Sequence, residues 1–289
     1  MFKVDAAEFF YNASRIGGFK EVSFSIKPGQ VLCILGPNGC GKTTLLKCLA
    51  GIFKLHKGRI WLDDTEVNRL HYSSLARTIG YVPQIHQPAF PFSVLDAVLV
   101  GRAPHLGFLE SPKKKDYEIA ETAIEALGIT HLMHRPYTEI SGGERQLVVF
   151  ARVMTQQPSL LLLDEPTSHL DFGNQIRVLR LVEELASTGL PVIMTSHFPD
   201  HAFLIGSKVA VMQNGQFLAF GPPEEVVTDQ NLEAIYKSKV KVTEISGHDG
   251  YRVCIPVKSE LDCTCSKKEL LDKLYRPRSA DIPMQQTPN

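Results

Sequence analysis

The stretch that decides the fold is Gly36-Pro37-Asn38-Gly39-Cys40-Gly41-Lys42-Thr43. It fits the pattern G-x-x-x-x-G-K-[S/T], in which backbone N–H groups surround the phosphates of a nucleotide while the lysine and the threonine reach phosphate and magnesium. Residues 31–35 before it form an apolar run typical of a strand, and residues 44–49 after it read as the start of a helix. Strand, loop and helix in this order predict a binding site for ATP or GTP.

Composition excludes several other classes of protein. The 31 Lys and Arg residues balance the 31 Asp and Glu residues, so no global field attracts nucleic acid, and no nucleic-acid partner is expected. No run approaches the roughly 20 apolar residues that span a bilayer, and residues 1–5 lack the pattern of a secretion signal, which predicts a cytoplasmic protein. Six cysteines are too few to staple 289 residues, which suits a reducing compartment.

The first half of the chain predicts a β region followed by a helical insertion. Apolar and polar residues alternate over 22–27, as in a half-buried strand, and 59–63 reads as another strand. Between 83 and 140 several prolines break the chain around one amphipathic helix that Gly128 ends. The lysines at 113–115 are expected to be a solvated helix start rather than a lipid or nucleic-acid patch.

The second half returns to parallel α/β character. Residues 160–163 and 191–195 read as buried strands, with a helical run at 175–185 between them. Residues 240–245 and 251–257 are expected to pair as a hairpin, and the polar remainder of the chain is expected to be loose.

Two carboxylates follow the predicted strand 160–163. Asp164 at the end of the strand is suited to holding the magnesium shell through water, and Glu165 is placed to polarise the water that attacks the γ-phosphate. The alternative is a strand that merely ends in solvated acids. The lysine of the glycine-rich loop favours the catalytic interpretation.

The type of nucleotide enzyme depends on Ile140-Ser141-Gly142-Gly143-Glu144-Arg145-Gln146. Ser141 can cap a helix, and the two glycines leave backbone N–H groups bare, which makes an anion site at the positive end of that helix. A serine three residues before a glutamate is also a capping box, so these residues alone fit an ordinary helix start equally well.

With these residues together, the chain resembles the ATP-binding subunits of ABC transporters. The matching segments are Walker A at 36–43, the LSGGQ signature motif at 140–144 and Walker B at 160–165, and the resemblance covers about the first 230 residues. It implies an α/β fold of the P-loop NTPase type, with a mostly parallel sheet, an antiparallel β subdomain, an inserted α-helical subdomain at about 85–155 and a small C-terminal extension. It also implies ATP and Mg²⁺ as cofactors.

The resemblance further implies domain limits and catalytic residues. The ATP-binding domain is expected at 1–238 and the extension at 239–289. Gln84 in a Q-loop and the switch histidine His197 are expected to join Glu165 in catalysis. The expected metal-binding residues are Thr43, Gln84 and Asp164. The residues expected to bind nucleotide are Tyr11, Gly36, Pro37, Asn38, Gly39, Cys40, Gly41, Lys42, Thr43, Thr44, Ser141, Gly142, Gly143, Glu144 and the D-loop residue Asp171.

An aromatic ring upstream is implied to stack on adenine. Tyr11 is the candidate, with Phe10 and Phe9 as alternatives, because an insertion near 14–18 blurs the register. Core packing is the alternative role for these rings.

In this family the Ser141 loop faces the nucleotide of the other subunit, so a second copy of the chain is expected as a partner. Residues 100–105 look like the G-R-x-P stretch of importer ATPases for iron-siderophore complexes, haem and cobalamin, although Arg102 also fits a plain solvated charge. Such a subunit docks on a membrane permease at the cytoplasmic face of the membrane, and an extracytoplasmic binding protein acts indirectly. The cargo stays open, because molybdate and tungstate importers share much of this sequence style.

Two other functions remain as alternatives. A soluble ABC ATPase acting on nucleic acid usually carries a coiled-coil insertion, zinc modules or a second cassette, and none is visible here. The tail after residue 239 is either a variable extension that pads the dimer or a sensor that uses Cys263 and Cys265, a C-x-C pair that makes only half of a metal site.

Glu144 departs from the family pattern, in which glutamine is usual. A carboxylate near the partner's γ-phosphate should weaken closure unless Arg145 or the capping-box bond to Ser141 neutralises it.

Overall fold

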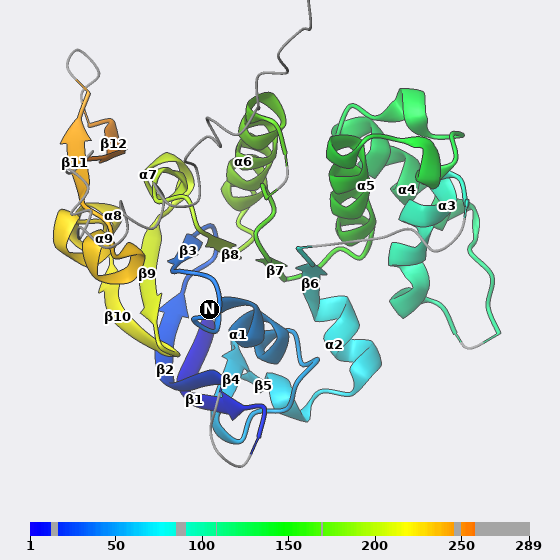
Figure 1. Cartoon of the computed structure of the whole chain (residues 1–289). Helices are drawn as coiled ribbons and strands as arrows, with labels where there is room; N and C mark the ends of the chain where they lie inside the picture. Colours follow the sequence, from blue (N-terminus) through cyan, green and yellow to red (C-terminus); the bar gives the residue numbers. More distant parts are fainter. Residues whose placement is uncertain (13–16, 85–90, 108, 169, 246–249, 258–289) are drawn as a thin grey trace, which may run out of the picture.

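The computed structural model describes residues 1–12, 17–84, 91–107, 109–168, 170–245 and 250–257. Its centre is a six-stranded sheet in the order β10-β9-β3-β8-β7-β6, in which all neighbours are parallel except β9 and β10 (Figure 1). The strands are β3 (Val31–Leu35), β6 (Ile79–Val82), β7 (Leu160–Leu163), β8 (Val192–Ser196), β9 (Lys208–Gln213) and β10 (Gln216–Gly221). The expected α/β fold with a mostly parallel sheet is confirmed.

Helices cover both faces of this sheet. The helices of the described residues are α1 (Lys42–Leu49), α2 (Tyr72–Thr78), α3 (Val94–Leu99), α4 (Lys114–Ala126), α5 (Gly142–Thr155), α6 (Phe172–Ser187), α7 (Asp200–Ile205), α8 (Pro223–Val226) and α9 (Asp229–Tyr236), with the 3-10 turns η1 (Val67–Arg69), η2 (Val100–His105), η3 (Thr130–Leu132) and η4 (Tyr137–Glu139). Alternate residues of β3 enter different cores, because side chains alternate across a strand. Cys33 and Leu35 pack with α5 and α6, whereas Leu32 and Ile34 pack with α1.

The carboxyl ends of the central strands meet at one edge of the sheet. Leu35 of β3 pairs with Ser196 of β8, and Leu163 of β7 pairs with Met194 of β8. The segments that follow these strands therefore lie side by side, and this edge is where open α/β sheets bind ligands.

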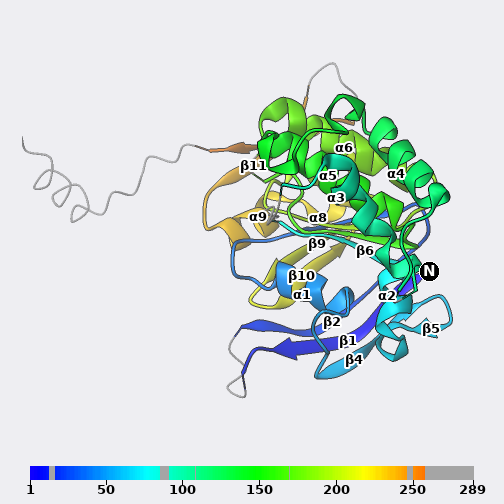
Figure 2. The same ribbon diagram turned by 90° about the vertical axis from the view of Figure 1, so that its right-hand side faces the viewer.

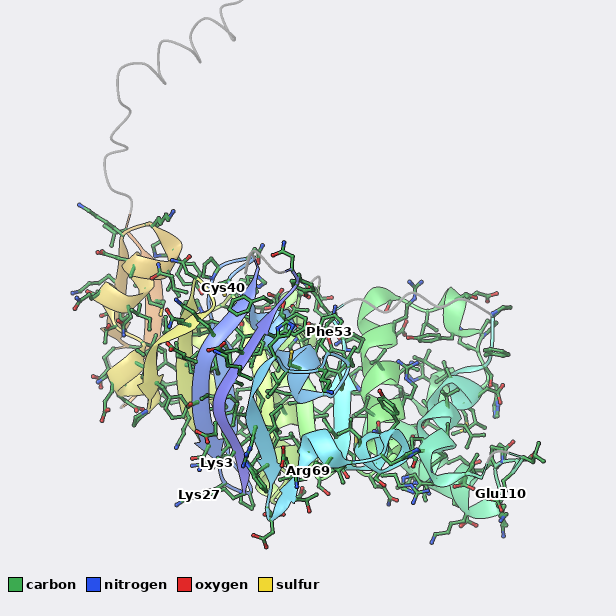
Figure 3. The ribbon with its side chains drawn as sticks, turned by 90° about the horizontal axis from the view of Figure 1, so that it is seen from below. Lys3, Lys27, Cys40, Phe53, Arg69 and Glu110 are labelled. Carbon is green, nitrogen blue, oxygen red and sulfur yellow. The ribbon has the colours of Figure 1, made fainter. Side chains whose placement is uncertain are left out.

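A four-stranded antiparallel sheet covers α1, in the order β2-β1-β4-β5. Its strands are β1 (Phe2–Phe10), β2 (Gly18–Ile26), β4 (Lys57–Leu62) and β5 (Thr65–Glu66). Figure 3 shows Lys3 and Lys27 at one end of β1 and β2 and Cys40 of the glycine-rich loop toward the other. The strand expected at 59–63 starts two residues earlier and ends at Leu62, because Asp63 turns the chain with φ 50°.

The helical insertion consists of α3, η2, α4 and α5, which pack against one another beside the sheet (Figure 2). The part of the expected insertion at 85–90 lies outside the described residues. α4 ends as expected before Gly128, whose φ of 64° is the left-handed conformation of a helix stop. The lysines at 113–115 are exposed at the start of α4.

Arg102 is buried, so its alternative reading as a solvated surface charge is wrong. Its side chain is 8% exposed, and its Nε donates to Asp116 Oδ1 at 2.9 Å. Its NH1 donates to the carbonyl of Thr155 and to Gln157 Oε1. The guanidinium thus ties η2 to the start of α4 and to the end of α5, the helix that the Ser141 loop begins.

Gly101→Ala is expected to destabilise the protein by about 1–3 kcal/mol, the usual cost of overpacking a core. A Cβ at Gly101 would lie 1.9 Å from the carbonyl oxygen of Arg152, so α5 and η2 would have to move apart. Urea unfolding monitored by circular dichroism measures this change. Gly142→Ala is the matched control, because a Cβ there meets nothing within 4 Å. Equal stability of the two variants would contradict the close packing of η2 on α5.

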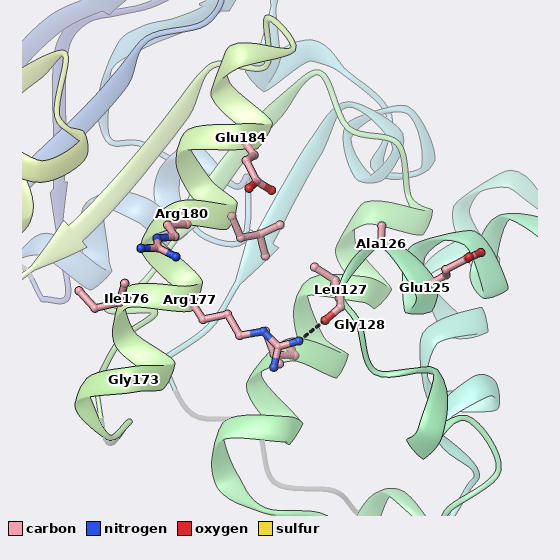
Figure 4. Close-up of a pocket in the computed structure, with 11 residues that line it drawn as sticks. Glu125, Ala126, Leu127, Gly128, Gly173, Ile176, Arg177, Arg180 and Glu184 are labelled. Carbon is pink, nitrogen blue, oxygen red and sulfur yellow. Dashed lines mark hydrogen bonds between the residues drawn. The ribbon is translucent and has the colours of Figure 1, made fainter.

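The insertion also contacts α6, which belongs to the central α/β layer. Arg177 of α6 donates from NH2 to the carbonyl of Leu127 at 2.6 Å, as Figure 4 shows. A Cβ on Gly128 would lie 3.0 Å from the same nitrogen, so glycine leaves room for the guanidinium. An open cavity of about 380 Å³ lies beside this contact, between α6 and the end of α4.

The chain continues after α9 into a two-stranded antiparallel sheet, β11 (Val240–Glu244) and β12 (Arg252–Pro256). These strands correspond to the expected hairpin. The rest of the tail, with Cys263 and Cys265, lies outside the described residues, as do residues 14–16 of the insertion expected near 14–18. None of the helices in the described part of the chain combines the length and the apolarity that crossing a bilayer requires.

Candidate functional site

An open cavity of about 400 Å³ lies at the carboxyl edge of the central sheet. It is lined by Tyr11, Gly17, Gly18, Asn38, Gly39, Gly41, Lys42, Thr43, Thr44, Gln84 and Glu165. The structure therefore brings the glycine-rich loop, the expected Q-loop and the second Walker B carboxylate together around one space. The Ser141 loop and Asp171 do not line it.

The glycine-rich loop connects β3 to α1 in a conformation that only glycine suits at key positions. Gly41 has φ 111°, and a Cβ there would lie 2.7 Å from the carbonyl oxygen of Gly18. A Cβ on Gly36 would lie 2.5 Å from the carbonyl oxygen of Met212. The first turn of α1 faces the cavity through Lys42, Thr43 and Thr44, and a helix start with free N–H groups favours a phosphate.

Lys42 is buried, and its ammonium group is hydrogen-bonded to carbonyl groups of its own loop. Its Nζ donates to the carbonyl of Gly36 at 2.7 Å and to that of Pro37 at 3.2 Å. The same ammonium lies 3.4 Å from Glu165 Oε1. The cation is thus held at the loop and is already charge-paired with Glu165.

Asp164 is 1% exposed and is surrounded by hydroxyl donors. Its Oδ1 accepts from Thr43 at 3.0 Å and from Thr195 at 2.9 Å, and its Oδ2 accepts from Tyr81 at 3.2 Å. Burial raises the pKa of this carboxyl above its usual value, and the three hydroxyl groups oppose the rise.

The oxygen donors at this point fit magnesium. Thr43 and Asp164 are in direct contact, and Mg²⁺ prefers oxygen ligands while keeping several waters and substrate phosphates. The described residues contain no cluster of three or more His, Cys, Asp or Glu side chains able to hold a metal. A magnesium ion here would therefore depend on nucleotide phosphates and water for most of its shell.

Glu165 is the point where three expected site residues converge. Gln84 Nε2 donates to its Oε2 at 2.8 Å, and His197 Nδ1 lies 3.5 Å from the same oxygen, while Lys42 lies near Oε1. Its backbone has φ 47°, a left-handed conformation that costs a side-chain-bearing residue about 1–2 kcal/mol. The N–H of Glu165 donates to Thr195 Oγ1 at 2.8 Å, which helps to hold the side chain toward the cavity.

The segment after β8 carries His197 to this carboxylate. Its side chain is 37% exposed and its ring lies 4.1 Å from that of Phe198. Ser196 accepts from the N–H of Phe198 at 2.9 Å, and its hydroxyl lies 3.0 Å from Nδ1 of the buried His201. Burial lowers the pKa of His201 to about 4.

Acid should therefore destabilise the fold through His201. Because its folded pKa is about 4 and its ordinary value is 6.5, the unfolded chain binds the extra proton between these pH values, so stability is present above pH 6.5 and is lost as the pH falls toward 4. The expected loss is about 1.4 kcal/mol per pH unit. Urea unfolding between pH 7.5 and 4.5 measures it in wild type and in His201→Gln. A wild-type slope no steeper than that of the variant would contradict the neutral buried imidazole.

Ser141 caps α5 as expected. Its hydroxyl accepts from the N–H of Glu144 at 3.3 Å, and Glu144 Oε2 accepts from the N–H of Ser141 at 2.8 Å, which completes a capping box. This contact lowers the pKa of Glu144, so the residue is a carboxylate. Arg145 does not contact that carboxylate: its NH2 donates to the carbonyl of Thr138. Of the two contacts considered for Glu144, only the capping box is present, and its donor is an uncharged N–H, so Glu144 keeps its net negative charge.

Asp171 caps the start of α6, which lies against the Ser141 loop. Its Oδ1 accepts from the N–H of Asn174 at 2.8 Å, and its Oδ2 from the side chain of the same residue at 3.0 Å. A Cβ on Gly143 would lie 2.7 Å from Asn174 Nδ2, whereas Gly142 is open to solvent. The two expected nucleotide-binding segments, 141–144 and the start of α6, therefore lie together, away from the cavity.

Of the three candidate aromatic rings, Tyr11 lines the cavity. It is 58% exposed, and its hydroxyl lies 3.1 Å from Thr44 Oγ1. Phe9 stacks on Phe53 with ring centroids 5.2 Å apart and packs against the core. Phe10 lines a neighbouring cavity instead.

Two functional contacts escaped the sequence reasoning. Thr195 bridges the two Walker B residues, and Tyr81 donates to Asp164 from the adjacent strand. Both residues lie inside motifs that the sequence did reveal, two positions before His197 and three before Gln84. A threonine and a tyrosine in buried strands resemble core residues, so only the sheet register identifies their polar partners.

Comparisons with known proteins show the family of the chain. A family model described as ABC transporter matches residues 19–168. The molybdate import ATP-binding protein MolC of Haemophilus influenzae is 38% identical over 234 residues, covering 81% of this chain and 87% of that protein. The hemin import ATP-binding protein HmuV of Nocardia farcinica is 35% identical over 240 residues, covering 83% and 82%. A solved chain, described as an inward-facing conformation of a metal-chelate type ABC transporter, superposes with a TM-score of 0.79 at 35% identity, covering 90% and 98%.

Proposed function

This chain belongs to the ABC transporter family of ATP-binding proteins, and from that premise we propose that two copies clamp two Mg-ATP molecules head to tail to drive a membrane permease. The main support is that the expected nucleotide-binding residues lie in two separate places on one chain. Lys42, Gln84 and Glu165 surround the cavity, whereas the exposed helix start at Ser141 lies outside it. A second copy supplies that helix start to the open side of the cavity.

The residues around the cavity have distinct roles in hydrolysis. The loop 36–43 and Thr44 bind the phosphates, and Lys42 exchanges its carbonyl partners for phosphate oxygens. Thr43, Gln84 and Asp164 would hold magnesium together with nucleotide phosphates, and the ion would supply charge neutralisation at the phosphates. Once Lys42 has turned to phosphate, Glu165 is free to accept a proton from the attacking water.

Gln84 and His197 both assist Glu165 at the same oxygen, Oε2. Gln84 already contacts Glu165, so nucleotide entry must rearrange the contact, and the movement is passed to the helical insertion that follows. His197 orients the attacking water and contacts the γ-phosphate. Tyr11 stacks on adenine, and Ser141, Gly142, Gly143, Glu144 and Asp171 act on the nucleotide bound by the other copy.

We further propose that the domain at 1–238 works at the cytoplasmic face of the membrane, with the extension at 239–289 beyond the ATPase core. The relatives named for hemin and molybdate import support an importer whose cargo is an iron-siderophore complex, haem or cobalamin, with molybdate or tungstate as the alternative. An extracytoplasmic binding protein delivers the cargo. Action on nucleic acid is disfavoured by the balanced charge of the chain.

Mixing two inactive variants tests the shared site. Lys42→Ala removes the phosphate-binding side of a site, and Ser141→Arg removes the side that the partner supplies. Each variant alone should be inactive. Equimolar mixing should restore about a quarter of wild-type phosphate release, because half of the dimers then hold one intact site of two. A mixture as inactive as its components would contradict the head-to-tail arrangement.

The cargo is tested in cells that lack the ATPase of a defined importer. Co-expression of this chain with its own permease should restore uptake of iron-siderophore, haem or cobalamin, and the Glu165→Gln variant should not. Restored uptake of molybdate alone would favour the alternative cargo.

Glu144→Gln is expected to strengthen ATP-driven dimerisation about two- to tenfold. A glutamine oxygen can accept the same N–H of Ser141, so the cap persists while one negative charge near the partner's phosphates disappears. Sedimentation velocity with Mg-ATP, in a Glu165→Gln background, measures the dimer dissociation constant. Glu139→Gln is a control for the same charge change elsewhere on the subdomain. Unchanged or weaker association would count against a repulsive role of Glu144.

A further inference from the structure

The loop that carries His197 is held from the C-terminal side of the molecule. The hydroxyl of Tyr236 donates to the main-chain carbonyl of His197 at 2.9 Å. The imidazole of the same residue approaches Glu165 Oε2 at 3.5 Å. His197 thus contacts Tyr236 through its main-chain carbonyl and Glu165 through its side chain.

Tyr236 is well placed to act as a fixed anchor. It is the last residue of α9, and Lys237 ends the helix in the left-handed conformation with φ 53°. Gln213 Nε2 donates to the carbonyl of Ala234 at 2.8 Å and fastens this end of α9 to β9. The phenol is half-buried, and burial raises its pKa, so it remains protonated and donates.

The hairpin β11/β12 connects α9 to the helix that follows His197. Val242 and Cys254 are directly opposite each other in the hairpin. The N–H of Val242 donates to Asp229 Oδ1 at 2.6 Å, and the N–H of Cys254 donates to Asp200 Oδ1 at 2.7 Å. Asp229 and Asp200 are the first residues of α9 and α7, so one strand pair joins the two helix starts (Figure 1).

We propose that Tyr236 is a positioning residue for His197. The hairpin, through Asp200 and Asp229, holds α7 and α9 so that the hydroxyl of Tyr236 stays at the carbonyl of His197. The inference rests on the proposed catalytic role of His197. Tyr236 fixes the carbonyl of His197, Asp200 fixes the chain three residues later, and the imidazole is left pointing at Glu165. The hairpin therefore supports catalysis from outside the cavity.

A double-mutant cycle tests Tyr236. Tyr236→Phe removes only the hydroxyl and is expected to lower kcat about fivefold with unchanged ATP affinity, the effect of losing one hydrogen bond that orients a catalytic group. His197→Ala is expected to lower kcat at least about fiftyfold, and Tyr236→Phe should then add nothing further in that background. Tyr72→Phe, at a tyrosine 79% exposed on α2, is the matched control. Phosphate release by the full chain measures all four variants.

The results distinguish the positioning role of Tyr236 from the catalytic role of His197. An unchanged kcat for Tyr236→Phe, or an equal loss in both backgrounds, overturns the positioning role while leaving His197 catalytic. An unchanged kcat for His197→Ala overturns the proposed role of His197 itself.

The hairpin is tested at Asp200. Asp200→Ala removes the acceptor of the Cys254 N–H and is expected to lower kcat severalfold at an unchanged ATP affinity, whereas Asp200→Asn keeps an oxygen acceptor and should retain most of the activity. Equal activity of Asp200→Ala and wild type overturns the contribution of the hairpin. Equal losses in Asp200→Ala and Asp200→Asn overturn it as well, because they assign the effect to the charge.

Discussion

Glu165→Gln is expected to lower ATP turnover by at least about a hundredfold while ATP binding persists, so that the protein accumulates as a closed dimer. General-base assistance contributes about 10²–10⁴ to such reactions, and an amide cannot accept the proton of the attacking water. The replacement is close to isosteric, and the N–H of residue 165 keeps its bond to Thr195. The lost turnover therefore reports chemistry rather than a misplaced backbone.

Phosphate release and light scattering, with and without Mg-ATP, measure both halves of this result. Glu183→Gln makes the same charge change on an exposed position of α6 and serves as the control. A Glu165→Gln protein that hydrolyses ATP at the parent rate would remove Glu165 as the base. A variant that is inactive but stays monomeric with Mg-ATP would instead count against the dimer.

The geometry explains why Glu165 is restrained in the described state. Its two oxygens lie against Lys42 on one side and against Gln84 and His197 on the other. On our proposal, nucleotide phosphates compete with Glu165 for Lys42, so nucleotide binding and activation of the base are linked.

The sequence predicts the parts of the site that depend on short segments. The loop 36–43 must follow a strand and start a helix, and Asp164 must end a buried strand, because each pattern has few other solutions. The order of motifs then places them at one edge of the sheet. Cap formation by Ser141 and Glu144 follows from a four-residue pattern in the same way.

Contacts between distant segments could not be predicted in this way. The role of Thr195 depends on the pairing of β7 with β8, and the anchor from Tyr236 depends on where α9 docks. From the sequence, Arg102 fits a solvated surface charge as well as the G-R-x-P stretch, and only the placement of Asp116 and the end of α5 around it excludes the surface charge. A single chain also cannot complete a site whose other half, on our proposal, belongs to a second copy.

Lys42→Ala is expected to weaken ATP binding by at least about a hundredfold, because charge-assisted hydrogen bonds to phosphate contribute about 1.5–3 kcal/mol each. The variant also leaves the carboxylate of Glu165, 8% exposed, without its nearby cation. Calorimetric titration with Mg-ATP measures the affinity, and the thermal shift that Mg-ATP gives to wild type should vanish. Lys47→Ala is the matched control, since Lys47 lies in the last turn of the same helix, over the ring of Phe53.

The double variant Lys42→Ala/Glu165→Gln separates the loss of ATP binding from the loss of stability: it should recover thermal stability and still fail to bind ATP. Wild-type affinity in Lys42→Ala would show that nucleotide is held elsewhere, and the cavity at the edge of the sheet would lose its assignment.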